Sequence, residues 1–598
     1  MASETWIQSI IHRLEEGGWA KWIRRTLLCV SVIYVAVLWL GLWGEPKFKG
    51  LNHERAIEQA QIAREIARGN GFSTKMIRPA AIWQFQKNTG AFPLNATPDT
   101  YHAPLNPYLS AIILKASNFV RMKLDKELKD PWEMSIKDRL YPGDRVLATV
   151  QLLFFLAAIF VNYLTFCRLF DQRLATFVTI ILLACQRFWD FALVGLPQML
   201  MLLLFSGVVY LFLRAIEARV AGKSTLWWAV GIGALFGLLA LTHALTLWMF
   251  GGALVFALFY FTPRLRDAAV MIAVVALVYS PWLVRNARVC GNPFGLSWYS
   301  GMSEIRGTEG QVMRSMDLKP SDVNPTLFRI KVTNTIVRQL GNIYSYLGHV
   351  VVAPVFFLAM LHIFKRPETT ALRWCGFLMW IFAVLGMAVF GLNNETDPHN
   401  LLSANDLHIL FVPLFACFGF ALVLVMWTRL DINVRLVRIA FMAMIYLVSA
   451  LPFIQVVIDL HKQSFGYPYQ WPPYVPPWIA ILSKWTTERE IIASDMPWGV
   501  AWYADRKSLW LPKTTQDFVT LNDYKTLGNN LVGLYLTPVT GDTRFMRDAV
   551  KGEYKEWAPF VIRQLTVKDF PLRAVTGMPI ENECVFYADR DRWSSRED

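Results

Sequence analysis

Long apolar runs recur along the whole chain and limit what it can fold into. A helix crosses the hydrocarbon core of a bilayer with about 20 apolar residues, and several runs here reach or approach that length. The chain is therefore expected to be an α-helical polytopic membrane protein with about eleven transmembrane helices. The runs lie at 27–44, 146–166, 174–188, 194–214, 226–243, 245–262, 268–285, 345–364, 372–392, 407–428 and 436–457.

Composition agrees with a membrane protein and decides how the net charge is interpreted. Of 598 residues, 55% are hydrophobic and 17% are charged, whereas about 25% are charged in an ordinary soluble chain. A net charge of +14 would indicate nucleic acid as the partner of a soluble protein. Here the Lys and Arg residues cluster at the ends of apolar runs, as membrane topology requires. We therefore expect membrane lipids as partners, and no nucleic acid.

The basic clusters also indicate an orientation. If the N-terminus is cytoplasmic, the basic clusters that border the runs all fall on the cytoplasmic side, which the positive-inside rule favours. Residues 1–26, with Trp6, Trp19 and Trp22, are then expected to form an interfacial helix on that side. We predict a bacterial inner-membrane protein with a periplasmic C-terminal domain. The clusters are Arg24/Arg25, Arg168/Arg173, Arg214/Arg219/Lys223, Arg264/Arg266, Lys365/Arg366/Arg373 and Arg429/Arg435/Arg438.

This orientation places three long segments outside the cytoplasm. They are the external loop 45–145, a second loop at 286–343 and the tail 459–598, and the transmembrane domain as a whole spans 27–458. Strands are expected at Glu490–Ser494 and Leu531–Leu536, with helical patterns between them. The tail is therefore predicted to be a soluble α/β domain.

The first external loop carries the densest set of candidate functional residues. A carboxylate just beyond the first span can act as a general base toward an acceptor hydroxyl or amine, and a neighbouring Lys or Arg can bind a phosphate leaving group. The alternative is an amphipathic surface helix with solvated charges and a glycine C-cap. In chain order the segment contains Glu54, Glu58, Arg64, Gly69-Asn70-Gly71, Lys75 and Arg78.

Two further clusters follow along the chain. Tyr101-His102-Ala103-Pro104-Leu105-Asn106-Pro107 leads into an apolar run at 108–114, which is too short to span a membrane and is expected to be a re-entrant or interfacial helix. The span at 268–285 ends in Pro281-Trp282-Leu283-Val284-Arg285-Asn286, and Gly291-Asn292-Pro293 comes next. The first loop and these two clusters, in this order, resemble the GT-C superfamily of integral-membrane glycosyltransferases.

The resemblance is greatest to the branch of protein-mannosyltransferase-like and aminoarabinose-transferase-like enzymes. The tail, with Ile492-Ala493-Ser494-Asp495 and Trp502-Tyr503-Ala504-Asp505-Arg506, is similar to the external domain of bacterial members. The resemblance implies a polyprenyl-phosphate-linked sugar as donor, transferred outside the cytoplasm with inversion. The acceptor, whether protein, glycolipid or polysaccharide, stays open, as does a requirement for a divalent metal.

The resemblance also implies roles for individual residues. Glu58 and Glu54 match the acidic residue of the first external loop that serves as catalytic base. A fixed positive group is needed to stabilise the charge that develops on the departing polyprenyl phosphate. The candidate ligands of that phosphate are Arg64, Lys75, Arg78, Arg285 and His102.

Two departures from the family pattern support a second hypothesis. Family members usually carry Asp near the start of the loop helix, where this chain has His53-Glu54. An Arg-Tyr pair commonly precedes the tenth span, where this chain has Asp406-Leu407-His408 before Pro413. The alternative is therefore a catalytically inactive GT-C-like scaffold subunit of a larger membrane complex. A transporter is disfavoured because the spans are largely free of ionisable groups.

Other polar residues are expected at the rim of a cavity. No metal site is predicted, because their spacing matches no metal-binding motif. Cys290 and Cys584 both fall in segments placed outside the cytoplasm, so this is the pair that could form a disulfide. The expected rim residues are Asp99, His243, Glu395, Asp397, His399, Asp406 and His408.

Overall fold

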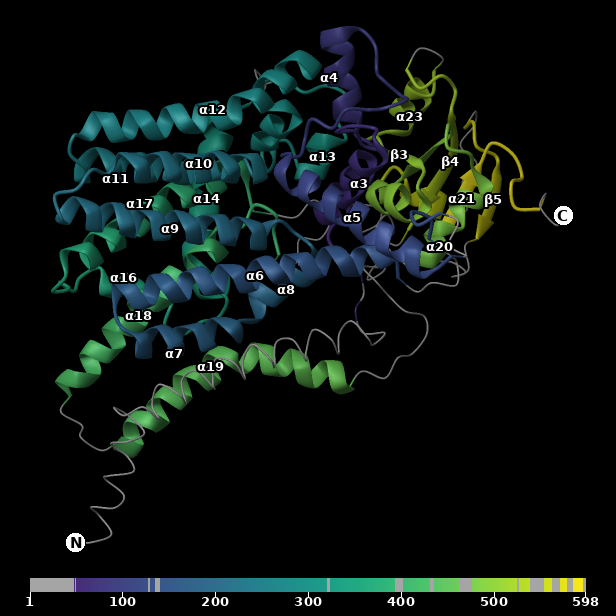
Figure 1. Ribbon diagram of the computed structural model, residues 1–598. Coiled ribbons are helices and arrows are strands. Elements are labelled where there is room, and N and C mark those ends of the chain that lie inside the picture. The colour runs from purple at the N-terminus through teal and green to yellow at the C-terminus, as the bar shows by residue number, and fades with distance from the viewer. Residues whose placement is uncertain are drawn as a thin grey trace.

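A bundle of long helices forms one part of the molecule, and a mixed β-sheet with its covering helices forms the other (Figure 1). The interfacial helix expected at 1–26 and the span expected at 27–44 lie outside the described residues, as do Glu395, Asp397 and His399. The computed structural model describes residues 48, 50–126, 130–134, 140–319, 323–392, 402–430, 435–462, 476–523, 526–537, 553–561, 570–577 and 584–594.

Six helices in these ranges are long and apolar enough to cross a membrane. The prediction of a helical membrane protein with several spans is therefore confirmed, while the expected number of about eleven spans is not established. The six are α6 (Pro142–Leu169), α9 (Gln198–Val220), α12 (Arg264–Cys290), α17 (Pro367–Phe390), α18 (His408–Arg429) and α19 (Arg435–Lys462).

The run at 174–188 forms a bent pair of helices instead of one straight span. α7 (Gln172–Leu183) and α8 (Gln186–Val194) meet at an angle of 52°. The bend arises because Cys185 between them has an extended backbone, with φ −74° and ψ 109°. Two apolar helices of 17 and 15 residues follow after α9, namely α10 (Leu226–Thr242) and α11 (Thr246–Tyr260).

The span expected at 345–364 is wrong in the form predicted, because no continuous helix occupies it. Only α15 (Ile343–Tyr346) and α16 (Val355–Ala359) form there, separated by turns. Gly348 and His349 both have positive φ, 70° and 58°. Two successive residues in the left-handed region cannot continue a right-handed helix. The apolar composition of this run therefore did not reveal that the helix is interrupted.

The first external loop folds into α3 (Glu54–Arg68), β1 (Met76–Ile77), α4 (Pro79–Thr89) and α5 (Leu105–Leu124). The helix expected over 108–114 is thus part of a longer one of 20 residues. Its exposed face is apolar, and it ends with basic residues in its last turn. The second external segment contains the short helices η1 (Gly295–Met302) and α13 (Glu309–Met313), then α14 (Pro325–Gly341).

The sheet combines a strand of the first loop with strands of the tail. Its order is β1-β3-β2-β4-β6-β5, in which β1, β3, β2 and β4 are parallel and β6 is antiparallel to both of its neighbours, β4 and β5. The strands expected at Glu490–Ser494 and Leu531–Leu536 are present. The tail strands are β2 (Ile491–Ser494), β3 (Lys507–Trp510), β4 (Leu531–Leu536), β5 (Ala574–Gly577) and β6 (Val585–Ala588).

Short helices connect and cover the tail strands (Figure 1). Between β2 and β3 the chain makes one helical turn and then a π-helical turn, which brings Trp502 and Asp505 against α3. These elements are α20 (Pro476–Ala480), α21 (Leu482–Trp485), α22 (Pro497–Gly499), η3 (Val500–Ala504), α23 (Thr515–Leu521) and α26 (Ala558–Val561).

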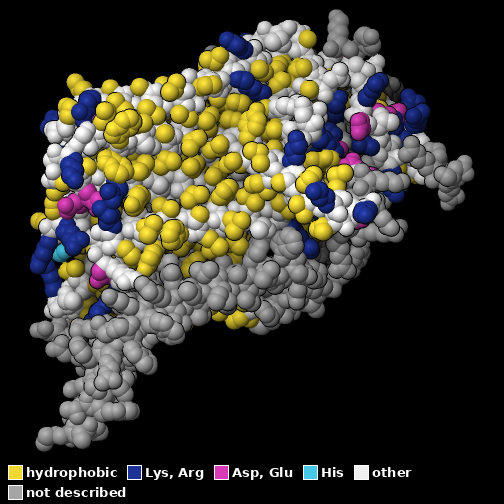
Figure 2. Space-filling view, in the orientation of Figure 1, with side chains coloured by type: hydrophobic (Ala, Val, Ile, Leu, Met, Phe, Trp, Pro, Cys, Tyr) yellow, Lys and Arg dark blue, Asp and Glu magenta, His cyan; other side chains and the backbone are white. Residues whose placement is uncertain are grey.

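The helical bundle and the external segments have separate hydrophobic cores. One core fills the helical bundle, and a second joins the first loop (Ile57), the second external segment (Val312) and the tail (Trp502). The space-filling view shows a broad apolar band over the helices, with Lys and Arg gathered at its two ends (Figure 2). Burial of the shared second core holds the three external segments together as one body.

Candidate functional site

A cavity of about 310 Å³ lies where the helical bundle meets the external segments. Its walls include several aromatic side chains, and its charged or ionisable groups come from α3, the loop before α5 and the end of α10. Apolar walls with a few convergent polar groups are typical of a small-molecule site. The lining includes Arg55, Gln59, Tyr101, His102, His243, Trp248, Tyr279, Trp282, Asn286, Trp298 and Asn405.

The α3 helix decides which of its side chains line the cavity. The side chain of His53 accepts a hydrogen bond from the N–H of Arg55, and Gly69, with φ 92°, ends the helix as predicted. Residues four apart share a helix face, so Arg55 and Gln59 both line the cavity. Glu54 and Glu58 occupy neighbouring positions, and neither is among the lining residues.

Glu58 belongs to a buried network of charges directly behind the cavity wall. Its Oε2 lies 2.5 Å from a guanidinium nitrogen of Arg78 and 2.9 Å from Nε2 of His102. On the other side of the imidazole, His102 Nδ1 lies 3.4 Å from Asp99, which also accepts hydrogen bonds from the backbone N–H groups of Tyr101 and His102. All four charged side chains are less than 5% exposed.

The network shifts the protonation of its members. Although burial opposes charge, Asp99 and Glu58 raise the pKa of His102 above its ordinary value. Against the same desolvation, Arg78 and His102 hold the pKa of Glu58 below its ordinary value, and His102 and Arg78 lower that of Asp99 to about 2. These shifts favour ionised carboxylates at Glu58 and Asp99 and the cationic form of His102, which lines the cavity.

One oxygen of Glu58 is not used by this network. Oε1 is buried and has no hydrogen-bond partner within the described ranges. A buried acceptor without a partner is costly, and it marks a place where a hydroxyl or amine donor would be stabilised. Glu54 is also buried, at 6% exposure. Of the two predicted bases, Glu58 is the one whose contacts the structure defines.

Arg55 brings a second cation to the cavity. Its guanidinium lies 2.6 Å from a carboxylate oxygen of Glu309, and it donates a hydrogen bond of 3.1 Å to Oδ1 of Asn405. The hydroxyl of Tyr101 donates to the other oxygen of Glu309 at 2.6 Å. The ion pair with Glu309 and the hydrogen bond to Asn405 therefore hold the planar guanidinium of Arg55 in place at the cavity wall.

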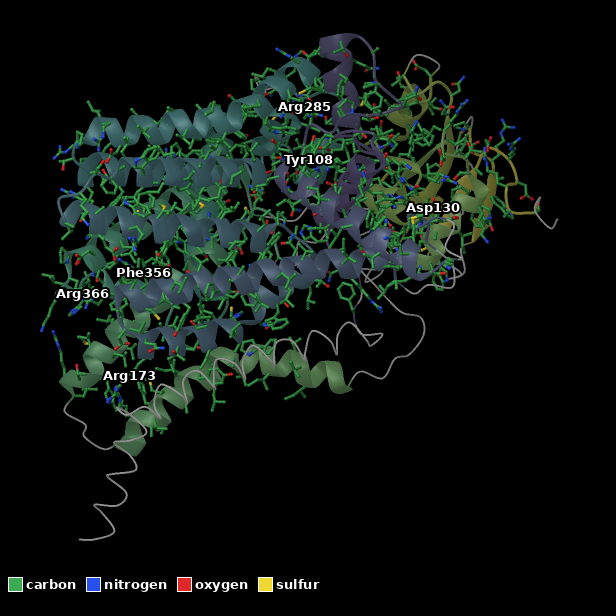
Figure 3. The ribbon with its side chains drawn as sticks, in the orientation of Figure 1. Tyr108, Asp130, Arg173, Arg285, Phe356 and Arg366 are labelled. Carbon is green, nitrogen blue, oxygen red and sulfur yellow. The ribbon has the colours of Figure 1, made fainter. Side chains whose placement is uncertain are left out.

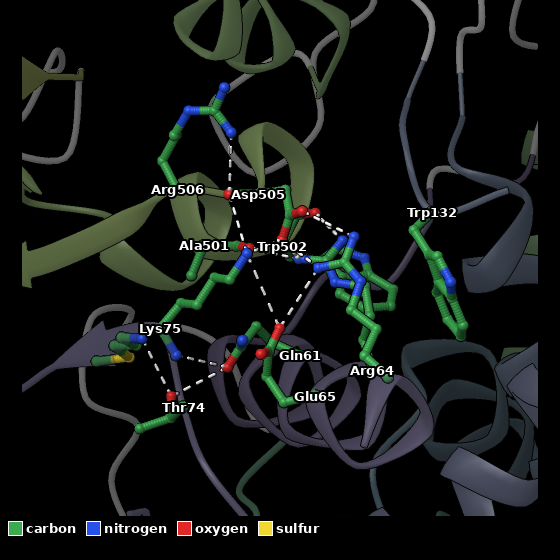
Figure 4. A network of polar contacts seen from close by, with 12 residues as sticks. Gln61, Arg64, Glu65, Thr74, Lys75, Trp132, Ala501, Trp502, Asp505 and Arg506 are labelled. Atoms are coloured by element: carbon green, nitrogen blue, oxygen red, sulfur yellow. Dashed lines mark hydrogen bonds and ion pairs between the residues drawn. The ribbon is translucent and has the colours of Figure 1, made fainter. Parts of the chain in front are cut away.

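Arg64 and Lys75, two of the predicted phosphate ligands, lie away from this cavity. Both contact Asp505 of the tail, at 3.0 and 2.6 Å, and Arg64 also donates to the carbonyl oxygens of Ala501 and Trp502 (Figure 4). Neither lines the cavity. The reason is the helix period: Arg64 lies more than two turns beyond Arg55, at the end of α3 that packs against the tail.

The remaining predicted ligands and rim residues divide between the cavity and its surroundings. His243 lines the cavity at the end of α10. Arg285 lies next to the lining residues Trp282 and Asn286, and it donates hydrogen bonds to the carbonyl oxygens of Asp99 and Phe72 (Figure 3). Arg285 therefore stabilises the loop that carries His102.

Asp406 and His408 were expected at the rim but are buried beside α18. Asp406 forms an ion pair of 2.7 Å with Arg187. His408 receives a hydrogen bond from the indole of Trp380, and its Nε2 lies 3.0 Å from Oε1 of Gln339. Their neighbour Asn405, in the turn before α18, lines the cavity instead.

No cluster of His, Cys, Asp and Glu in the described part of the chain is arranged to hold a metal ion. No disulfide joins Cys290 and Cys584, both of which are buried thiols.

The sequence analysis missed Arg55, Gln59 and Asn405 of the cavity lining, and Glu309 behind it. Arg55 and Gln59 were not predicted because the interpretation of this helix rested on its acidic residues. The helical period of 3.6 residues nevertheless places the two side chains on one face. Glu309 and Asn405 come from distant segments, at separations that no local pattern reveals.

No family model matches the chain, and no curated protein matches its sequence. Solved structures do match its fold. A crystal structure of ArnT from Cupriavidus metallidurans bound to undecaprenyl phosphate gives a TM-score of 0.52 at 13% identity and covers 94% of this chain and 98% of that one.

Two weaker matches are to an archaeal enzyme, and no argument rests on them. The oligosaccharyltransferase of Archaeoglobus fulgidus, in complex with zinc and sulfate, gives a TM-score of 0.45 at 12% identity over 83% of this chain and 70% of that one. AglB from the same organism, in complex with an inhibitory peptide and a dolichol-phosphate, gives 0.44 at 13% identity over 84% and 71%.

Proposed function

We propose that this chain, which has the fold of the GT-C superfamily of membrane glycosyltransferases, moves a sugar from a polyprenyl-phosphate donor to an acceptor on the non-cytoplasmic side of a membrane. The observation that carries the proposal is the cavity, where two cationic side chains of the outer segments face aromatic walls at the end of apolar helices. A solved ArnT structure with this fold, which covers 94% of the chain, is bound to undecaprenyl phosphate.

The cationic groups supply what the leaving group needs. When the bond between the sugar and the phosphate breaks, negative charge develops on the polyprenyl phosphate, and fixed cations stabilise that charge. Arg55 and the imidazolium of His102 both line the cavity, and each is held by carboxylates behind it. A phosphate bound here would be positioned without reorganisation of either cation.

Glu58 is the candidate catalytic base. Its free Oε1 accepts the proton of an acceptor hydroxyl or amine while the acceptor attacks the anomeric carbon and the polyprenyl phosphate leaves. Its lowered pKa keeps the carboxylate ionised at neutral pH. Because Oε1 is buried and Glu58 does not line the cavity, the acceptor reaches it only when side chains of the cavity wall move.

The test is transfer of radiolabelled sugar from membrane lipid extracts by the wild type and by the Glu54→Gln, Glu58→Gln double variant. We expect the double variant to lose at least about 100-fold in rate, the range typical of a lost general base. Each single variant assigns the role to one residue. Equal transfer by wild type and double variant would remove the proposed base.

A second candidate function is a GT-C-like scaffold subunit without activity. It is favoured by one observation, that the proposed base Glu58 forms ion pairs with Arg78 and His102 through one of its oxygens. A scaffold would be recovered in a stable complex with other membrane proteins, and it would transfer no sugar from any extract. The same transfer assay, with mass spectrometry of the purified material, separates the two functions.

A further inference from the structure

The short helix α13 touches the cavity at one end. Glu309, its first residue, is 4% exposed and accepts from both Arg55 and the Tyr101 hydroxyl. Arg55 and Tyr101 line the cavity, while Glu309 itself does not. The position of this carboxylate therefore decides where the Arg55 guanidinium lies.

The other end of α13 is held by the tail. Arg314 follows the helix directly and is completely buried. Its guanidinium donates to the carbonyl oxygens of Leu511 and Pro512, at 2.5 and 3.0 Å. It also lies 3.1 Å from Oε1 of Glu553 and stacks over the ring of Tyr554.

Glu553 holds both ends of α13 with one carboxylate. Its Oε1 contacts Arg314, and its Oε2 accepts a hydrogen bond of 2.8 Å from the hydroxyl of Thr308. Thr308 is the N-cap of α13, and its hydroxyl oxygen accepts from the N–H of Gln311. Between the two contacts, Val312 and Met313 are buried in the core that the external segments share.

We propose that Glu553 and Arg314 of the tail junction are positioning residues, which fix α13 so that Glu309 holds Arg55 and Tyr101 in place for a polyprenyl phosphate. The proposal rests on the proposed function, since it needs a phosphate ligand in the cavity. A helix of five residues has no stability of its own. Its place is therefore set by contacts at its ends, and the tail supplies them.

The experiment measures binding of undecaprenyl phosphate to the full chain in nanodiscs. Glu553→Gln keeps the size of the side chain and removes its charge, and Arg314→Lys keeps the charge and removes the guanidinium. Both variants weaken the contacts that hold α13. We expect roughly three- to tenfold weaker binding for each, the range for residues that act through a neighbour. Glu490→Gln is the matched control, because Glu490 pairs with Arg592 in the same domain and has no contact with α13.

A double-mutant cycle separates positioning from a general loss of structure. If Glu553 acts through Glu309, the Glu309→Gln, Glu553→Gln variant binds no more weakly than Glu309→Gln alone. Additive losses, or a Glu490→Gln loss as large as that of Glu553→Gln, would indicate a merely structural role and overturn the proposal. Unchanged binding by Glu553→Gln would overturn it too, with the function intact, whereas no binding by the wild type would overturn the function itself.

Discussion

Four buried charges behind the cavity balance one another. Glu58 and Asp99 carry two negative charges, and Arg78 and His102 carry two positive ones. Buried ions are tolerated when they are paired, and removal of one partner leaves the other without compensation. The network therefore stabilises the protein only as a complete set.

Arg78→Met tests this balance. We expect it to destabilise the protein by about 3 kcal/mol, because it leaves a net negative charge in a buried site. Glu58→Gln, Arg78→Met restores neutrality and should melt at a higher temperature than Arg78→Met alone. The measurement is the melting temperature of purified protein in detergent. Additive losses in the double variant would show that the charges are not coupled.

The protonation of His102 predicts how stability depends on pH. Because its pKa in the fold is raised above the ordinary 6.5, His102 contributes stability that is complete below pH 6.5 and is lost as pH rises through the raised pKa. Asp99, with its pKa at about 2, and Glu58 act oppositely, since their contributions are lost only as pH falls through their lowered values.

We therefore expect the melting temperature to fall from pH 6.5 toward pH 9.5, and binding of undecaprenyl phosphate to weaken over the same range. His102→Gln should be less stable at pH 6.5 and should show a smaller alkaline decline. Other groups titrate alike in both proteins, so the difference between the two curves reports His102. Parallel curves would mean that His102 is neutral in the folded state.

For individual residues, the sequence predicted which side chains could act as a base better than it predicted which side chains lie in contact. Glu58 was a candidate because it follows the first span on a helical stretch, and the structure gives it defined contacts. The partners of Arg55 could not be found in the same way, because Glu309 and Asn405 lie hundreds of residues further along the chain. A single sequence contains no signal for such pairs.

Among the elements, β1 has the largest effect for its size. Two residues, Met76 and Ile77, pair with Ser508 and Leu509 and thereby add the first loop to the sheet of the tail. So short a strand has no periodicity that could predict it. Next to it, Asp505 contacts Arg64, Arg68 and Lys75 at once (Figure 4).

Asp505→Asn tests this junction. The variant leaves three neighbouring cations with Glu65 as their remaining nearby carboxylate, and Asp505 itself is 19% exposed. We expect a loss of about 2 kcal/mol, less than for a fully buried pair, and faster proteolysis of the tail. Glu490→Gln is again the control, and an unchanged melting temperature would show that β1 and the apolar core suffice.

Over the whole molecule, hydropathy predicted a helical membrane protein, and the motifs of the outer loops predicted a fold that the solved ArnT structure shares. Hydropathy was less informative where helices are bent or broken, as between α7 and α8 and at the turns after Tyr346. These elements are stabilised by packing inside the bundle. The mean hydropathy of a sequence window carries no information about which segments pack together.

The two ends of the helical bundle differ in a way that predicts its orientation. The sheet and the cavity lie at one end, and Arg173 and Arg366 lie at the other (Figure 3). Short basic turns are retained in the cytoplasm, so we expect the end with Arg366 to be cytoplasmic and the end with the tail to be external. The cavity would then open on the side of the membrane that the proposed reaction requires, outside the cytoplasm.

Cysteine labelling in intact cells tests this orientation. Arg366→Cys and Asp591→Cys replace exposed residues at opposite ends of the molecule. A membrane-impermeant maleimide, applied after the outer membrane is opened, should label Asp591→Cys at once and Arg366→Cys only after the inner membrane is permeabilised. The wild type corrects for its own cysteines, of which the described ones are largely buried. The reverse pattern would place the cavity in the cytoplasm, where a donor displayed on the outer leaflet could not reach it, and the proposed reaction would fail.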